Sequence, residues 1–131
     1  MPSPPDLPSP ASFSTLKTGD NAYVVSVEGE LDLYSAPELA AELDALVADA
    51  PDVVLDLSGV GFVDSTALGA IVGASRSLRA GGGRLLLVAS RDVRMVLELV
   101  GLDRILPVYE STERALEHLV GSVVLRKLEE R

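Results

Sequence analysis

The chain has 131 residues, a length typical of one domain, and 47% of them are hydrophobic, which is enough for a core. Its net charge of −9, with 11 lysines and arginines against 20 aspartates and glutamates, argues against direct binding of nucleic acid. The absence of cysteine excludes disulfides, a cysteine nucleophile and thiolate zinc sites.

Residues 1–11 are rich in proline and predict a disordered lead-in to a single domain at 12–120. Residues 121–131 form a C-terminal extension, which is compatible either with more helix or with a frayed end. The N-terminus lacks the basic and apolar stretches of a signal peptide, and no apolar run reaches membrane-spanning length. We therefore expect no membrane association and a cytoplasmic location.

The first expected elements are a short edge strand at 13–16 and a strand at 23–27, joined by a turn into an antiparallel hairpin. A loop then leads to Ser35, which predicts the N-cap of a helix. Glu38 stands three residues later and completes the pattern of a capping box. Apolar residues recur at helical spacing after it, until Pro51 stops the helix.

Residues 56–69, with the sequence Asp-Leu-Ser-Gly-Val-Gly-Phe-Val-Asp-Ser-Thr-Ala-Leu-Gly, organise the rest of the chain. A short apolar run at 53–57 predicts a buried central strand, followed by a glycine-bearing turn at 59–61. Asp64-Ser65-Thr66 then opens a helix, because carboxylate and hydroxyl groups satisfy the free N–H groups of a first helical turn. If the protein has a switch, we expect it at this helix start.

Further along, a buried strand is expected at 84–88, a helix from Ser90 to Gly101, a short strand at 104–108 and a last helix capped by Ser111. Strands and helices thus alternate after the initial hairpin, as they do where parallel strands are joined by helices. The sequence predicts an α/β fold: a single layer domain with a mixed, mostly parallel sheet of four to five strands and about four helices.

The short motifs that are typical of enzymes match this sequence poorly. The glycines at 59–61 follow a strand, but Asp64 stands where a dinucleotide motif has its third glycine, and its charge would repel a pyrophosphate. Ser65 lies outside the G-x-S-x-G frame of a hydrolase, and His118 falls between apolar positions of the last helix. Asp56 and Asp64 are better explained as a strand residue and a helix cap. We expect no catalytic residue, no cofactor and no metal ion.

Gly69 and Gly73 lie four residues apart in the helix that Asp64 opens, although each costs stability relative to alanine. One explanation is close contact between this helix and the sheet. The other is a flat face of small residues on which another protein lies. The sequence does not choose between them, and the second is compatible with the first.

The run Asp64-Ser65-Thr66-Ala67-Leu68-Gly69 resembles the anti-sigma factor antagonists of the STAS-domain family. Gly29-Glu30-Leu31-Asp32, Asp56-Leu57-Ser58 and Val100-Gly101-Leu102 are similar to the family as well, and the order of elements agrees from Phe13 to Val120. Members commonly carry glycine where this chain has Ala67. Alanine stiffens the helix start without removing the hydroxyl acceptor.

The resemblance implies a regulatory protein and not an enzyme. In that family the first hydroxyl residue after the aspartate is phosphorylated by an anti-sigma factor that is also a serine kinase, and here that residue is Ser65. The unphosphorylated form binds the anti-sigma factor and frees the sigma factor, and a phosphoserine phosphatase restores it. Thr66 stays open as a second acceptor. Without the resemblance, Ser65 is explained as an ordinary helix cap.

Around the phosphorylation site that the resemblance implies, we expect a partner surface made by Glu30, Asp32, Asp64, Ser65, Thr66, Gly69 and Gly73. A phosphate carries a charge of about −1.5 to −2, which a free helix N-terminus tolerates but a docked acidic interface repels. For Glu30 and Asp32, the other explanation is that they only solvate their loop. An alternative function is a STAS-domain scaffold subunit of a stress-signalling assembly or a lipid-transport complex, without kinase control.

Overall fold

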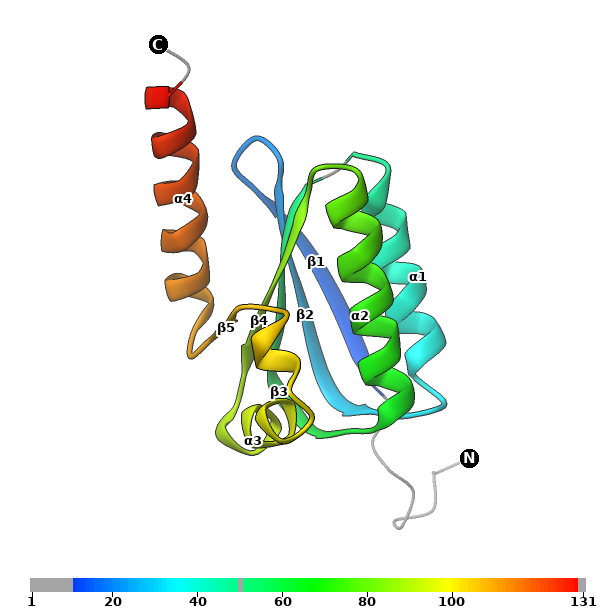
Figure 1. The fold of residues 1–131 in the computed structure, drawn as a ribbon. Helices are drawn as coiled ribbons and strands as arrows, with labels where there is room; N and C mark the ends of the chain where they lie inside the picture. Colours follow the sequence, from blue (N-terminus) through cyan, green and yellow to red (C-terminus); the bar gives the residue numbers. More distant parts are fainter. Residues whose placement is uncertain (1–10, 50, 130–131) are drawn as a thin grey trace.

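The structure, a computed structural model, describes residues 11–49 and 51–129, without the side chains of 122–127. At its centre a five-stranded sheet runs in the order β1-β2-β3-β4-β5 (Figure 1). The strands are β1 (Ser12–Thr18), β2 (Ala22–Leu31), β3 (Asp52–Val63), β4 (Arg84–Ala89) and β5 (Val108–Tyr109). β1 is antiparallel to β2, and every other neighbouring pair is parallel, so the predicted mixed and mostly parallel sheet is confirmed.

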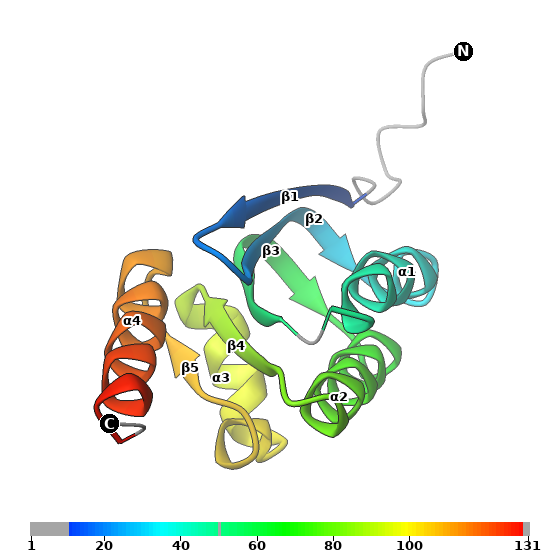
Figure 2. The same ribbon diagram turned by 90° about the horizontal axis from the view of Figure 1, so that it is seen from above.

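Helices cover both faces of this sheet. They are α1 (Ala36–Val47), α2 (Ser65–Ala80), α3 (Arg91–Leu99), the 3₁₀ helix η1 (Leu102–Arg104) and α4 (Thr112–Glu129). Figures 1 and 2 show α1 and α2 side by side on one face, with α4 on the other. α3 packs into the same core as α1 and α2. The predicted α/β class with about four helices is therefore confirmed.

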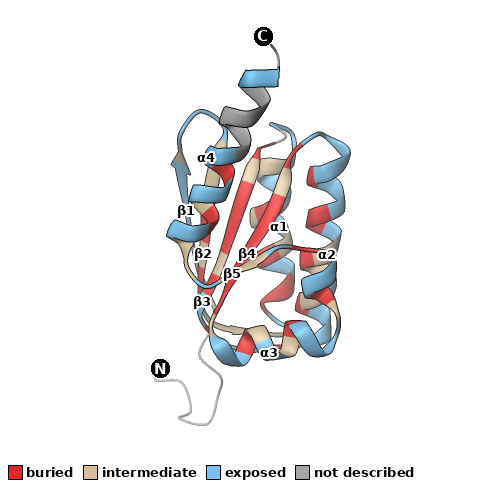
Figure 3. Cartoon of the chain, turned by 60° about the vertical axis from the view of Figure 1, so that its left-hand side comes forward, coloured by how far each residue is buried: buried red, intermediate tan, exposed pale blue. Residues whose placement is uncertain are grey.

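Two hydrophobic clusters, one on each side of the sheet, hold these layers together (Figure 3). Along β3, Val53, Leu55 and Leu57 point into the larger cluster under α1, α2 and α3, and Val54 points into the smaller one under α4. This alternation follows from the two-residue period of a strand. The continuous apolar run thus marks a strand buried on both faces, as the sequence predicts.

β3 is longer than the sequence predicts. The expected turn at 59–61 is wrong, because the strand continues to Val63 and stays paired with β2, which itself reaches Leu31. The pairing shifts register twice, between Ser26 and Glu28 and between Gly29 and Glu30. At Gly59 an added Cβ would lie 2.9 Å from Cγ of Glu28, so this glycine permits close approach of the two strands.

The short edge strand expected at 104–108 is present but displaced, because it forms only at Val108–Tyr109. Gly101 adopts a left-handed conformation with φ of 78°, and the chain then forms η1, in which the buried Leu102 accepts the N–H of Leu106 through its carbonyl. Only Val108 and Tyr109 pair with the sheet. The backbone groups of this segment are partly satisfied inside the turn, which explains why so little of it is strand.

The structure bears on the prediction for the C-terminal end of the chain but not on the prediction for the N-terminal end. α4 runs as one helix to Glu129, so the extension after residue 120 is helical at least that far. The boundary at residue 120 between the predicted domain and its extension stays a prediction. The proline-rich lead-in at 1–10 lies outside the described residues, as do residues 130–131.

Candidate partner-binding site

The segments that follow β2 and β3 lie together at the carboxyl-end edge of the sheet. Glu30 pairs with Phe62 and Leu31 with Val63, at the carboxyl ends of these parallel strands. Directly after that pair, the N–H of Asp64 donates a 3.0 Å hydrogen bond to the carbonyl oxygen of Leu31. The loop between β2 and α1 and the start of α2 therefore lie together, at the lower end of the molecule in Figure 1.

Asp64 caps α2. It has an extended backbone, and its carboxylate oxygen Oδ1 accepts a 3.0 Å hydrogen bond from the N–H of Ala67. Ser65 is the first residue of the helix, and both Ser65 and Thr66 are exposed. The alternative that Ser65 is an ordinary helix cap is therefore wrong, because the Asp64 carboxylate caps the helix instead.

Asp32 shapes the loop before α1. Its Oδ1 accepts hydrogen bonds from the N–H groups of Tyr34 and Ser35, at 2.9 and 3.1 Å. The Ser35 hydroxyl donates to the carbonyl oxygen of Glu30 and accepts from the N–H of Asp32, both at 2.9 Å. Ser35 is at the N-cap position as predicted, but the capping box with Glu38 is wrong, since this hydroxyl bonds back toward β2.

The edge around Ser65 combines acidic charge with exposed apolar groups. Glu30, Asp32 and Asp64 are half-buried. The side chains of Leu33, Tyr34 and Phe62 are 60%, 88% and 50% exposed, and sequence reasoning missed all three as site residues. For two of them the sequence did contain an indication, because Leu33 and Tyr34 directly follow the family-like run at 29–32. Exposed aromatic and apolar side chains at a loop edge are typical of protein interfaces.

The two helical glycines face solvent. An added Cβ at Gly69 or Gly73 would meet nothing within 4 Å, so the explanation by close helix-to-sheet contact is wrong. Together with Ser65 they recur every four residues and form one exposed stripe along α2. The opposite side of the helix is buried and carries Ala67, Ile71, Ala74 and Leu78.

The alternative of a paired-carboxylate site does not fit the geometry. Asp56 lies on β3 eight residues before Asp64, so at the usual rise of a strand the two are about 25 Å apart. The Asp56 carboxylate instead accepts the N–H of Ser58 at 2.9 Å. Among the described residues, no three histidines, cysteines or acidic residues are grouped so that they could hold a metal ion.

Comparison with known proteins decides the family. Residues 14–115 match the STAS domain family. The chain belongs to the STAS-domain family. The anti-sigma-B factor antagonist of Staphylococcus aureus is 36% identical over 98 residues, which cover 73% of this chain and 91% of that protein. The same-named protein of Bacillus subtilis is 32% identical over 104 residues, covering 78% and 94%.

Solved structures agree with this STAS-domain assignment. The crystal structure of an anti-sigma factor antagonist from Mycobacterium paratuberculosis superimposes with a TM-score of 0.75 at 34% identity, covering 88% of this chain and 97% of that one. The segment matched to the STAS domain runs from β1 into the first turn of α4. It therefore contains the whole edge around Ser65 and leaves most of α4 outside. None of the described helices is long and apolar enough to cross a membrane.

Proposed function

We propose that this STAS domain is an anti-sigma factor antagonist switched by phosphorylation of Ser65. In its unphosphorylated form it binds an anti-sigma factor that is also a serine kinase, and it thereby frees the sigma factor. Phosphorylation of Ser65 by that kinase ends the binding, and a phosphoserine phosphatase restores it. The protein acts in the cytoplasm and does so by binding, not by catalysis. The observation that carries this proposal is the exposed Ser65 at the first position of α2, beside the separate cap Asp64.

The free protein can carry a phosphate at this position. Because Asp64 caps the helix, modification of the Ser65 hydroxyl leaves the bond from Ala67 to Asp64 in place. The first N–H groups of a helix and the positive end of its dipole favour an anion. The switch therefore needs no refolding of α2.

In a docked complex the same phosphate is unfavourable. Its charge of about −1.5 to −2 would be desolvated next to Asp64, on an edge that also carries Glu30 and Asp32. Like charges brought together in an interface cost several kcal/mol. The phosphate also adds bulk to the stripe formed by Ser65, Gly69 and Gly73, and so spoils the fit of a partner lying on that stripe.

The partner surface proposed here includes the seven predicted residues and the exposed loop side chains. Glu30, Asp32, Asp64, Ser65, Thr66, Gly69 and Gly73 come from the two loops and the exposed side of α2. Leu33, Tyr34 and Phe62 add the apolar contact area that usually dominates binding energy. In this arrangement Asp32 acts mainly by holding the loop that presents Leu33 and Tyr34.

The first test is the intact mass of the protein isolated from its own host, before and after phosphatase treatment, with the modified residue mapped. We expect a phosphoryl group on Ser65 that the phosphatase removes. The isolated anti-sigma factor kinase should then modify the Ser65 protein and the Thr66→Ala variant, but not Ser65→Ala. Phosphorylation or Ser65→Asp should weaken binding of that kinase by at least about ten-fold, as expected for like charges in an interface.

Two outcomes would contradict the switch. Unchanged affinity of the kinase for the phosphorylated protein would remove the mechanism, even if Ser65 is modified. A protein that stays unmodified across growth and stress conditions would favour the alternative, a STAS scaffold subunit of another complex without kinase control.

A further inference from the structure

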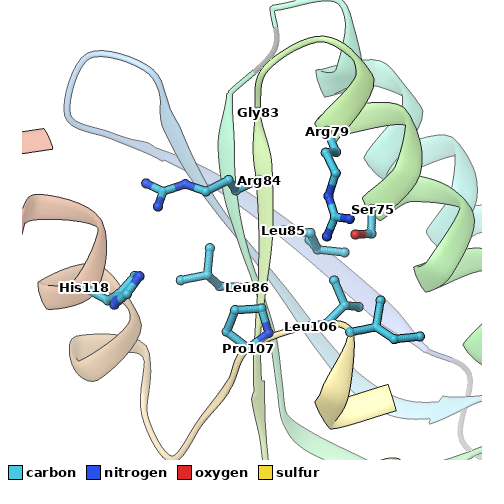
Figure 4. Close-up of a pocket in the computed structure, with 10 residues that line it drawn as sticks. Ser75, Arg79, Gly83, Arg84, Leu85, Leu86, Leu106, Pro107 and His118 are labelled. Carbon is cyan, nitrogen blue, oxygen red and sulfur yellow. The ribbon is translucent and has the colours of Figure 1, made fainter. Parts of the chain in front are cut away.

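A hollow of about 270 Å³ lies at the free edge of β4, away from the edge that carries Ser65 (Figure 4). It is open to solvent and is bordered by β4, the C-terminal half of α2, the segment between η1 and β5, and α4. The short length of β5 creates it. This strand pairs with β4 only at Leu87 and Val88, which leaves residues 84–86 without a strand on that side.

The lining of this hollow is apolar and basic. Leu85, Leu86, Ile105, Leu106 and Pro107 supply its apolar wall. The charged or titratable residues that line it are Arg79, Arg84 and His118, and no acidic residue is among the described residues there. In a chain with a net charge of −9, a hollow whose described lining carries arginines and no acidic residue favours an anion.

The two arginines differ in their partners. Nε of Arg84 lies 3.1 Å from a carboxylate oxygen of Asp52, and its Nη2 donates to the other oxygen at 3.1 Å, so its charge is already balanced. Arg79 is an exposed residue at the mouth of the hollow, and it makes no ion pair with any described residue. The hollow therefore offers one positive charge without a counter-charge, which matches a ligand carrying a single negative charge.

Ser75 supplies a second polar group beside Arg79. Its side chain is only 6% exposed, yet it lines the hollow. Among the hydrogen bonds between described residues, none involves the Ser75 hydroxyl. Ser75 and Arg79 are one turn apart on α2, and Figure 4 shows their polar ends next to each other above Leu85 and Leu106. Because no described polar side-chain atom is both buried and without a partner, the Ser75 hydroxyl is open to the hollow, where it can hydrogen-bond to a bound ligand.

We propose that this hollow binds a small organic carboxylate. The guanidinium of Arg79 and the hydroxyl of Ser75 hold the carboxylate group, and Leu85, Ile105 and Leu106 contact its apolar part. A charge-assisted bond from a guanidinium to a carboxylate is among the stronger hydrogen bonds in proteins. The volume is just below the range of about 300–1,000 Å³ typical of ligand pockets, which limits the ligand to a single ring or a short branched chain.

This site is separate from the phosphorylation site. Ser75 follows Ser65 by ten residues, or about 15 Å along the helix axis. A ligand in the hollow leaves the partner surface open, so the proposal does not depend on the proposed function.

The test is a titration of the ¹⁵N-labelled full chain with benzoate, followed by amide chemical shifts. We expect saturable shifts at Ser75, Arg79, Leu85 and Leu106, none at Ser65, and a Kd of about 1 mM for so small a ligand. Acetate, which lacks the ring, and benzamide, which lacks the charge, should each bind at least about ten-fold more weakly. If benzamide binds as tightly as benzoate, the charge has no role in binding. If acetate binds as tightly as benzoate, the apolar wall has no role.

Matched variants test the two polar groups. Arg79→Gln should weaken benzoate binding at least about ten-fold. Arg76 is equally an exposed arginine of the same helix but does not line the hollow, so Arg76→Gln should leave binding unchanged. Ser75→Ala should weaken binding by a smaller factor. The proposal is wrong if Arg76→Gln and Arg79→Gln have equal effects, since the affinity for benzoate would then depend only on the net charge of the protein. It is also wrong if no shifts occur around the hollow while the spectra show a folded chain.

Discussion

The N–H of Asp64 donates to the carbonyl oxygen of Leu31 across 3.0 Å. Leu31 is the last residue of β2, and Asp64 is the residue that caps α2. One hydrogen bond thus joins the loop before α1 to the helix start that carries Ser65. The placement of Ser65 follows from this bond and from the long pairing of β2 with β3, and not from the local motif alone.

Asp64→Ala should destabilise the protein, and Ser65→Ala should not. The Asp64 variant loses the cap bond to Ala67, which typically costs about 1 kcal/mol. For a domain of this size that lowers the Tm by about 4 °C. Ser65→Ala, at an exposed helical position, should stay within about 0.5 kcal/mol of the parent chain. Denaturant unfolding of both variants measures this, and a loss in Ser65→Ala as large as in Asp64→Ala would show that Ser65 shares the capping.

Leu33→Ala should weaken binding of the anti-sigma factor kinase without loss of stability. The Leu33 side chain is 60% exposed in the loop beside Ser65, so its removal leaves no cavity in the core. If Leu33 is one of the minority of interface residues that dominate binding, its truncation should cost about 1 kcal/mol, or about five-fold in Kd. Leu16→Ala is the matched control, because Leu16 is 66% exposed on β1. Titration calorimetry should separate the two, and equal affinities would remove the loop from the partner surface.

Much of the fold could be predicted because its signals are local. The spacing of apolar residues places α1 and α2, and the cap at Asp64 lies at a recognisable helix start. The extension of β3 could not be predicted, because Gly59 and Gly61 look like a turn until the register with β2 is known. Whether a glycine permits a turn or a close approach depends on the neighbouring strand.

The candidate site was predictable in its motif residues and not in its apolar ones. Asp64 and Ser65 stand in a recognisable run, so their place on the edge was expected. Leu33 and Tyr34 are also contiguous with a recognisable run, but apolar residues are usually buried, and only the folded chain shows their exposure. The orientation of Gly69 toward solvent is equally a property of packing.

Gly59→Ala should destabilise the protein, and Gly61→Ala should not. At Gly59 a new Cβ would lie 2.9 Å from Cγ of Glu28 and 3.2 Å from the carbonyl oxygen of Val27. Moving these strand atoms apart should cost about 1–3 kcal/mol. At Gly61 the same substitution meets nothing within 4 Å. Denaturant unfolding of both variants checks the difference, and equal stability would mean that β2 moves away from Gly59 at Glu28 without a cost in free energy.

Tyr109→Phe should make the stability less sensitive to alkaline pH. Burial raises the pKa of Tyr109 above its ordinary value of 10.0, and the charge of Arg84 offsets part of this effect. The unfolded chain therefore ionises first, so the stability from the neutral phenol is present below pH 10 and is lost as the pH rises through the folded pKa. Unfolding free energies measured across this range should fall less steeply in Tyr109→Phe. Tyr34→Phe, at an 88% exposed position, should keep the parent slope, and an identical slope in Tyr109→Phe would contradict the burial effect.

Gly69→Ala and Gly73→Ala should raise stability while weakening partner binding. Each position is an exposed helical glycine with open space at its Cβ, so alanine should add up to about 1 kcal/mol. The added methyl groups also stand on the stripe that Ser65 begins, where a closely fitting partner has no room for them.

Gly121→Ala in α4 provides the control for this pair, because it too has open space at its Cβ. It should gain stability to a similar extent and bind the kinase as the parent chain does. Thermal unfolding combined with binding of the kinase measures both properties. If all three variants gain stability and none loses affinity, the exposed glycines of α2 are not part of the partner surface, and that surface is confined to the loop edge around Asp32 and Ser65.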